Sequence, residues 1–254
     1  MENLGSLIKW GLTPCLVGAL ATALLFGSFF SNILGVADPG WFAKHQNDTE
    51  ALVLGRMVKS RQDGFFSAGG FNGWGSAADL PKTTRDQWIG GKALDFQRQA
   101  YLEGLRFESY CAYLSQPGGQ GLLFSFLDQR IPLPASARLL FLRTLTSFYS
   151  ALVLALLVMW LHREFGITPA LAGLASMLLS QWLIVFGKNL WWCLWACYLP
   201  MVAILWILRW QRTFAGRHTF SCGLVVFLAL LLKDFINGFE YITTVVVMVL
   251  VPFV

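Results

Sequence analysis

The chain has 254 residues, of which 56% are hydrophobic and only 13% are charged, and it carries a net charge of +5. A soluble domain is usually about 25% charged, so this chain lacks the polar surface that would cover a globule of its length. The composition excludes an ordinary soluble protein and indicates that much of the surface faces membrane lipid.

The charge is distributed unevenly along the chain. Residues 38–137 hold ten basic and ten acidic residues, so the positive excess lies entirely in the remaining segments. A nucleic-acid-binding protein would gather its basic residues on a water-facing domain. We therefore expect no nucleic-acid partner.

Six apolar stretches are candidates for membrane spans, because about 20 apolar residues of helix cross a bilayer core. Four run over residues 12–36, 144–161, 167–186 and 190–208, and two more begin at 220–232 and 241–254. We therefore expect an all-α fold, a polytopic transmembrane helix bundle. The last stretch is too short for a crossing, so we expect residues 1–254 to form a single membrane domain that is the N-terminal part of a longer chain.

The basic residues predict the direction of these spans. The loop 209–218 holds three arginines and a histidine without an acidic residue, and the positive-inside rule makes such a loop cytoplasmic. Counting spans back from it puts the N-terminus inside and residues 38–137 outside. We expect a multi-pass protein of the cell inner (plasma) membrane, with 38–137 as an extracytoplasmic loop between the first and second spans.

This loop is too long to be a mere connector. Leu54, Met57 and Val58 follow helical spacing, so we expect residues 49–59 to form an amphipathic surface helix with these side chains toward lipid. The segment 65–76 is rich in Gly and Phe and should be irregular. The rest of the loop is expected to hold a mobile polar stretch at 82–93, a second helix at 94–114 and a short apolar helix at 122–127.

Asp48 and Glu50 form an acidic pair that lies about ten residues past the first span, on the outer face. Carboxylates so near lipid are costly unless they are used or solvated. One could take the proton of an acceptor, and the pair could hold a divalent cation such as Mg²⁺ or Mn²⁺ on donor phosphates. Equally, Asn47 with Glu50 fits a capping box, and Asp48 would then only stabilise the first turn of a helix.

Several other charged residues are candidates for substrate binding on the same face. Arg56, Lys59 and Lys188 could each bind a lipid phosphate, or could contact lipid headgroups in general. Glu240 opens the last apolar stretch and could contact sugar hydroxyls, or be an ordinary interfacial acid beside Tyr241. The sequence contains no P-loop, dinucleotide fingerprint or metalloprotease motif.

The order of these features resembles the GT-C family of membrane glycosyltransferases: a cytoplasmic N-terminus, one span, a large outer loop with an early acidic motif, then many spans. The run DTEALVLGR at 48–56 resembles the acidic motif of that family, and KNLWW at 188–192 and YLP at 198–200 are similar to bacterial members. The resemblance implies a transferase that takes a polyprenyl-phosphate-linked sugar as donor, with Asp48 as base or metal ligand. The chain departs from the family in having about six apolar stretches where members have more.

Two other functions remain open from the sequence. A transporter or flippase of lipid-linked saccharides would show charges or broken helices in mid-span. The predicted spans have few of either, since Arg143 lies at the edge of its span and Pro200 is the one mid-span breaker. A non-catalytic envelope membrane protein would use the outer loop to bind a partner.

Overall fold

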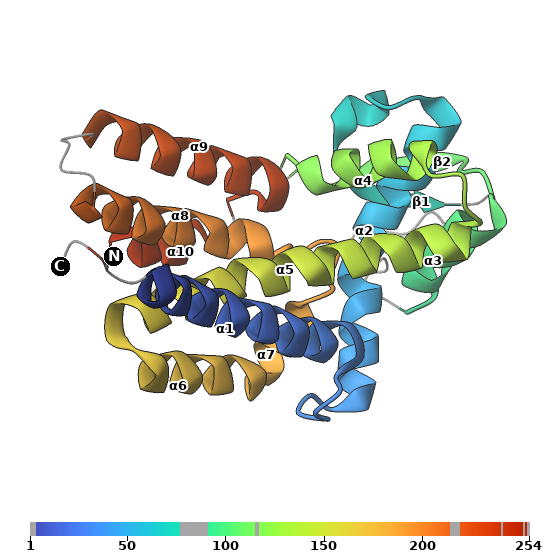
Figure 1. Cartoon of the computed structure of the whole chain (residues 1–254). Coiled ribbons are helices and arrows are strands. Elements are labelled where there is room, and N and C mark those ends of the chain that lie inside the picture. The colour runs from blue at the N-terminus through green and yellow to red at the C-terminus, as the bar shows by residue number, and fades with distance from the viewer. Residues whose placement is uncertain are drawn as a thin grey trace.

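The structure is a computed structural model that describes residues 4–76, 91–114, 117–213, 219–239, 241–250 and 252. Within these ranges it describes only the backbone of residues 4–13, 44–49, 91–94, 211–213, 219 and 221. The described residues are mostly helical, as the sequence predicts, and a pair of short strands is the exception. Figure 1 shows a bundle of long helices at one end and a smaller part at the other, with α5 running from one into the other.

The two parts use different segments of the chain. The bundle consists of α1 (Leu4–Ser31), α5 (Ala135–Phe165), α6 (Ile167–Leu178), α7 (Gln181–Phe186), α8 (Leu194–Thr213), α9 (Thr219–Asn237) and α10 (Ile242–Leu250). The smaller part consists of α2 (Pro39–Asp63), η1 (Ser67–Gly70), β1 (Gly73–Ser76), α3 (Gly91–Glu103), β2 (Ser109–Ala112) and α4 (Gly119–Arg130). We call this smaller part, residues 39–130, the loop domain.

Two of the described helices are long and apolar enough to cross a membrane, judged by length and composition. They are Pro14–Ser31 within α1 and Ala135–Phe165, which is α5. The two helices pack side by side, with Leu25 and Phe29 in one buried cluster with Leu154. Other apolar side chains remain exposed, including many on α9, and an apolar surface of this extent suits contact with lipid. The structure therefore supports the membrane assignment through two of the six predicted spans.

The stretch 167–186 is not one span, contrary to the prediction. α6 ends at Leu178, and Ser180 begins α7 as its N-cap, accepting a hydrogen bond from the Leu183 amide at 3.4 Å. Serine favours this position because its hydroxyl satisfies a free backbone amide. The pieces have 12 and 6 residues, and each is too short to cross a bilayer core.

The first long helix of the loop domain, α2, begins earlier than the sequence indicates. Asp38 is its N-cap and accepts a hydrogen bond from the Trp41 amide at 2.8 Å, while Pro39 fills the first helical position. Both residue types are favoured there. The capping-box interpretation of Asn47 and Glu50 is therefore wrong, because both residues lie well inside the helix.

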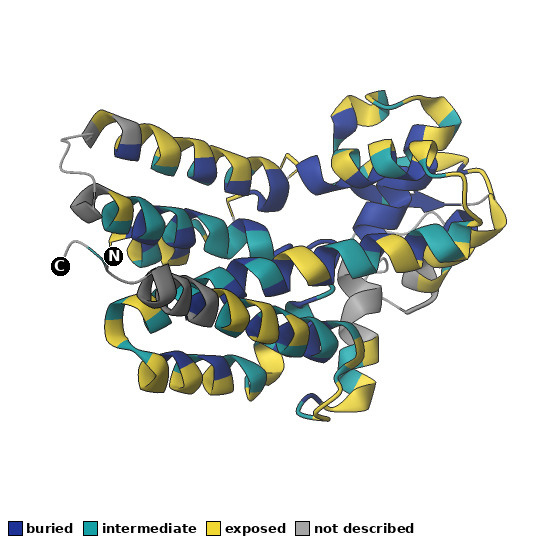
Figure 2. Ribbon diagram, viewed as in Figure 1, coloured by how far each residue is buried: buried dark blue, intermediate teal, exposed yellow. Residues whose placement is uncertain are grey.

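The helix predicted over 49–59 is confirmed, but its predicted contact with lipid is wrong. Leu54, Met57 and Val58 are at most 4% exposed and belong to the main core of the loop domain. Tyr101 and Phe107 are among the residues that cover them. Figure 2 shows the middle of α2 as almost entirely buried. The apolar face of the helix thus packs against protein.

The remainder of the loop domain corrects the all-α prediction locally. The predicted helix 94–114 ends at Glu103, where Gly104 takes a positive φ of 73° that suits a helix end. β2 then pairs antiparallel with β1, with Trp74 opposite Cys111. The predicted short helix at 122–127 is confirmed as part of α4. Most of the predicted mobile stretch, residues 82–90, lies outside the described residues.

Candidate functional site

An ion pair between Glu50 and Arg143 joins the loop domain to the bundle. Glu50 is only 1% exposed. The Nε of Arg143 donates to Oε1 of Glu50 at 2.9 Å, and its Nη2 donates to Oε2. Such a two-bond pair is strong and fixes the guanidinium plane. Both carboxylate oxygens of Glu50 therefore accept a hydrogen bond from Arg143.

Lys188 lies beside this pair, in the turn between α7 and α8. Its Nζ lies 3.7 Å from the centre of the Phe42 ring and 3.4 Å from the carbonyl oxygen of Phe30. Burial and the charge of Arg143 lower the pKa of Lys188 to about 8, although Glu50 raises it. The three charged groups thus share one environment. We call Glu50, Arg143 and Lys188 the junction site.

The described side chains of the junction site carry one net positive charge, since two cations surround one carboxylate. A partly buried cationic site of this kind favours an anionic group such as a phosphate. Arg143 supplies a fixed donor plane and Lys188 a compact point charge, and the two residue types complement each other in binding phosphate oxygens. The arrangement can therefore bind an anion and stabilise negative charge on it.

An aromatic pocket of about 280 Å³ adjoins the turn that carries Lys188. Phe186 and Trp192 line the pocket on either side of this turn, with ring centres 5.9 Å apart. Trp192 also lies 5.2 Å from the ring of Tyr241, which lines the pocket as well. The pocket is mostly apolar, as sites for amphiphilic ligands usually are, and Lys188 lies in the turn between two of its lining residues, Phe186 and Trp192.

Two predicted site residues lie wholly or partly outside the described residues. Asp48 lies in α2, but its side chain is outside the described residues, and Glu240 is outside them altogether.

A divalent cation does not fit the residues that the structure describes. Among them, no group of three or more His, Cys, Asp or Glu side chains could hold a metal ion. Glu50 already uses both oxygens to bind Arg143.

Arg56 and Lys59, both predicted to bind substrate, lie away from the junction site. Arg56 is 0% exposed and donates to the hydroxyls of Ser60 at 3.0 Å and Ser67 at 2.7 Å, so it holds η1 against α2. This enclosure leaves its guanidinium no open face for a ligand phosphate, which corrects the prediction for Arg56. Lys59 pairs with Asp63 on its own helix, about 14 Å along the axis from Glu50.

Arg143 is the residue that sequence reasoning missed. Its position near the end of an apolar span is a usable signal, because a charge there needs a partner. The partner, Glu50, is 93 residues away in the sequence and cannot be found from spacing.

A second buried network supports the junction site. Asp128 of α4 is 3% exposed and accepts hydrogen bonds from Arg61 at 2.6 Å, Arg138 at 2.7 Å and the Tyr101 hydroxyl at 2.6 Å. These residues tie α2, α3 and α4 to α5. Burial alone would raise the pKa of Asp128, but hydrogen bonds from Arg61 and Tyr101 lower it overall. The network therefore links α2 to α5 at a second place, apart from the Glu50–Arg143 pair.

Comparison with known proteins finds no match for this chain. The chain matches no family model, no curated protein and no solved structure. The function proposed below therefore rests on the junction site, its surroundings and the sequence resemblance.

Proposed function

We propose that this protein is an integral membrane glycosyltransferase that moves a sugar from a lipid-phosphate donor at the outer leaflet. The observation that supports the proposal best is the pairing of a cationic site with an aromatic pocket. Lys188 and Arg143 would hold the phosphate, and the pocket beside Phe186 and Trp192 would take the first part of the hydrocarbon tail. A lipid phosphate has these two parts in the same order.

The donor class follows from the resemblance described above. The runs 48–56 and 188–192, which resemble the GT-C family, contribute Glu50 and Lys188 to one site. The members of that family use polyprenyl-phosphate-linked sugars. We therefore propose a polyprenyl-phosphate sugar as the donor and membrane lipid as the surroundings in which it is bound.

Asp48 is the general base in this proposal. It takes the proton of an acceptor hydroxyl while that oxygen forms a bond to the anomeric carbon of the sugar. The bond between this carbon and the phosphate oxygen breaks, and the lipid phosphate leaves with the electron pair. Lys188 and Arg143 stabilise the charge on the leaving phosphate. Glu50 is a positioning residue, because its carboxylate holds the guanidinium of Arg143.

The test is sugar transfer by membranes that contain the full-length protein. Asp48→Asn should lower the transfer rate by about 10²–10⁴-fold, the usual contribution of a positioned base. Asp63→Asn, which also removes an acid from α2, should stay near the wild-type rate. Protein level and insertion should match in both variants. Normal transfer by Asp48→Asn would remove the catalytic assignment.

A flippase of lipid-linked saccharides is a second candidate, favoured by the break between α6 and α7. Transporters often form their substrate sites at broken helices, and here Ser180 marks the break. A flippase would move a lipid-linked sugar between the leaflets of a reconstituted vesicle without making a new glycosidic bond. Asp48→Asn would leave that movement unchanged, so the two assays together separate the candidates.

A further inference from the structure

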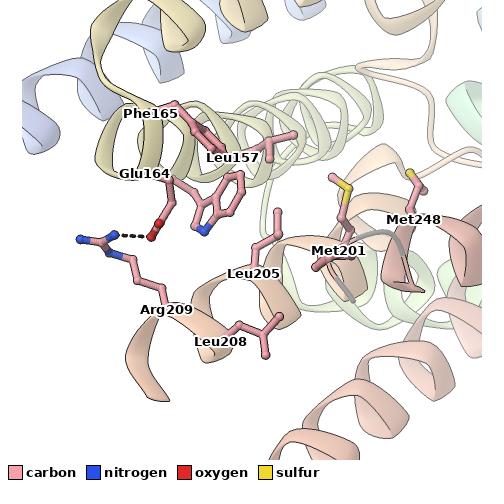
Figure 3. A pocket seen from close by; sticks show the side chains of 10 residues that line it. Leu157, Glu164, Phe165, Met201, Leu205, Leu208, Arg209 and Met248 are labelled. Atoms are coloured by element: carbon pink, nitrogen blue, oxygen red, sulfur yellow. Dashed lines mark hydrogen bonds and ion pairs between the residues drawn. The ribbon is translucent and has the colours of Figure 1, made fainter. Parts of the chain in front are cut away.

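A larger pocket, of about 460 Å³, lies at the other end of the bundle. Figure 3 shows its walls, which include Leu157 from α5, Leu205 and Met201 from α8, and Met248 from α10. The lining is almost wholly apolar apart from Glu164 and Arg209. A space of this kind suits a hydrocarbon chain.

The pocket and the junction site are separated by roughly the thickness of a bilayer core. Glu164 follows Arg143 by 21 residues on the same helix, α5, which corresponds to about 30 Å along its axis. The hydrocarbon core of a bilayer is also about 30 Å thick. If the junction site lies at one leaflet, the pocket lies at the other.

The mouth of this pocket carries positive charge. Glu164 and Arg209 form an ion pair across α5 and α8, and the Arg209 side chain remains 32% exposed. The guanidinium of Arg163 lies 5.2 Å from the centre of the Trp206 ring, so a second cation is held at the same end of α5. Near this end of α5 the structure thus describes two guanidinium groups, and Glu164 is the one acid among the described lining residues. Each guanidinium has five N–H donors, so Arg209 can bind a phosphate oxygen while it keeps its carboxylate partner.

We propose that this pocket binds an anionic phospholipid of the cytoplasmic leaflet. One acyl chain lies along Leu157 and Leu205, and the headgroup phosphate contacts Arg209 and Arg163. Charge complementarity selects this occupant, because the cytoplasmic leaflet is the anionic one and basic pockets between spans bind its headgroups. The proposal rests on membrane embedding and not on sugar transfer, so it stands or fails separately from the proposed function.

The experiment measures phospholipid retained by the full chain. The protein is reconstituted in phosphatidylcholine vesicles, with or without phosphatidylglycerol, and is then extracted in mild detergent. Native mass spectrometry identifies the phospholipid that stays bound. Wild-type protein should keep phosphatidylglycerol in preference to phosphatidylcholine. Leu205→Trp fills the pocket and should abolish this retention. Leu228→Trp, on an exposed face of α9, is the matched control and should behave as wild type.

Two charge variants test the headgroup. Arg163→Gln should weaken phosphatidylglycerol binding about fivefold, the effect expected from one basic contact near the membrane surface. Arg209→Gln should weaken phosphatidylglycerol binding at least as much. This variant also removes the ion pair with Glu164, so Arg163→Gln is the test of the headgroup contact that leaves that ion pair intact. Equal retention by Leu205→Trp and Leu228→Trp would overturn the proposal. Equal retention of the two lipids by the wild-type protein would overturn it as well.

Discussion

Arg143 in α5 donates two hydrogen bonds to Glu50 in α2, and this contact joins the loop domain to one of the two helices that could cross a membrane. Glu50 has almost no contact with solvent, whereas the Arg143 side chain is 19% exposed. The pair therefore has a structural role in seating α2 on α5. In the proposed function it also holds a cation at the phosphate site.

Removing one partner of this pair should destabilise the protein. Glu50→Gln leaves Arg143 without a countercharge, and breaking a buried pair in this way costs about 3–5 kcal/mol. Because Arg143 keeps some contact with solvent, we expect about 3 kcal/mol in denaturant unfolding in detergent. Asp63→Asn, which breaks the Lys59–Asp63 pair within α2, should cost about 0.5 kcal/mol or less. Equal losses in the two variants would mean that Glu50 and Arg143 are not coupled.

The Asp128 network should make the loop domain sensitive to acid. The folded-state pKa of Asp128 lies below its ordinary value of 3.8, so its stabilisation is fully present above that pH. It is lost as the pH falls through the lowered folded-state pKa. An acid titration of unfolding should show this loss in the wild type, and Asp128→Asn should be less stable at neutral pH and lack that part of the acid dependence.

Tyr101→Phe is a smaller change to the same network than Asp128→Asn. It removes one hydrogen bond to Asp128 and should cost about 1–2 kcal/mol of unfolding free energy. The Tyr101 hydroxyl has a pKa raised to about 12, mainly by burial, so this loss should not change with pH in the neutral range. A loss that varied across neutral pH would point to a different partner for Tyr101.

Binding of a lipid phosphate should weaken as Lys188 loses its proton. Its pKa of about 8 means that the ammonium is charged at neutral pH and neutral in mild alkali. Affinity for a polyprenyl phosphate should therefore fall as the pH rises through about 8. Lys188→Arg stays charged and should bind with little pH dependence. A wild-type affinity that is flat through this range would place the phosphate elsewhere.

The loop domain should react with reagents outside the cell. Cys111 in β2 is an exposed free cysteine, so it is a native reporter for a membrane-impermeant maleimide. Whole cells or spheroplasts should label the wild type, and Cys111→Ser should remove that signal. Labelling of Cys111 only after lysis would reverse the predicted orientation.

The sequence predicts the elements of this fold better than their contacts. Helices in the first apolar stretch and over 49–59 follow from hydropathy and spacing, which are local properties. Asp38 followed by Pro39 was a stronger helix-start signal than Asn47, and it places the true beginning of α2. The strands β1 and β2 are too short for a period-two pattern and are paired by tertiary contacts alone.

The same limit applies to the candidate site. Glu50 and Lys188 are identifiable from the sequence as charged residues near lipid, each with several possible roles. Their meeting with Arg143 depends on where α2 crosses α5, and no local pattern encodes that crossing. Arg56 was misassigned because a basic residue on an amphipathic helix looks exposed until η1 is seen to cover it.

The most direct test of the central claim is the affinity of the purified, full-length chain for a short-chain polyprenyl phosphate at neutral pH. Lys188→Gln should weaken binding about 10–100-fold, the loss expected for one hydrogen bond to a charged group. Lys59→Gln is the matched control, because it removes a lysine from α2 that lies away from the junction site. The affinity of this variant should be within about twofold of the wild type, a change too small to reflect the loss of one charged contact. Wild-type affinity in Lys188→Gln, or equal losses in the two variants, would contradict a phosphate site at the junction of the loop domain and the bundle.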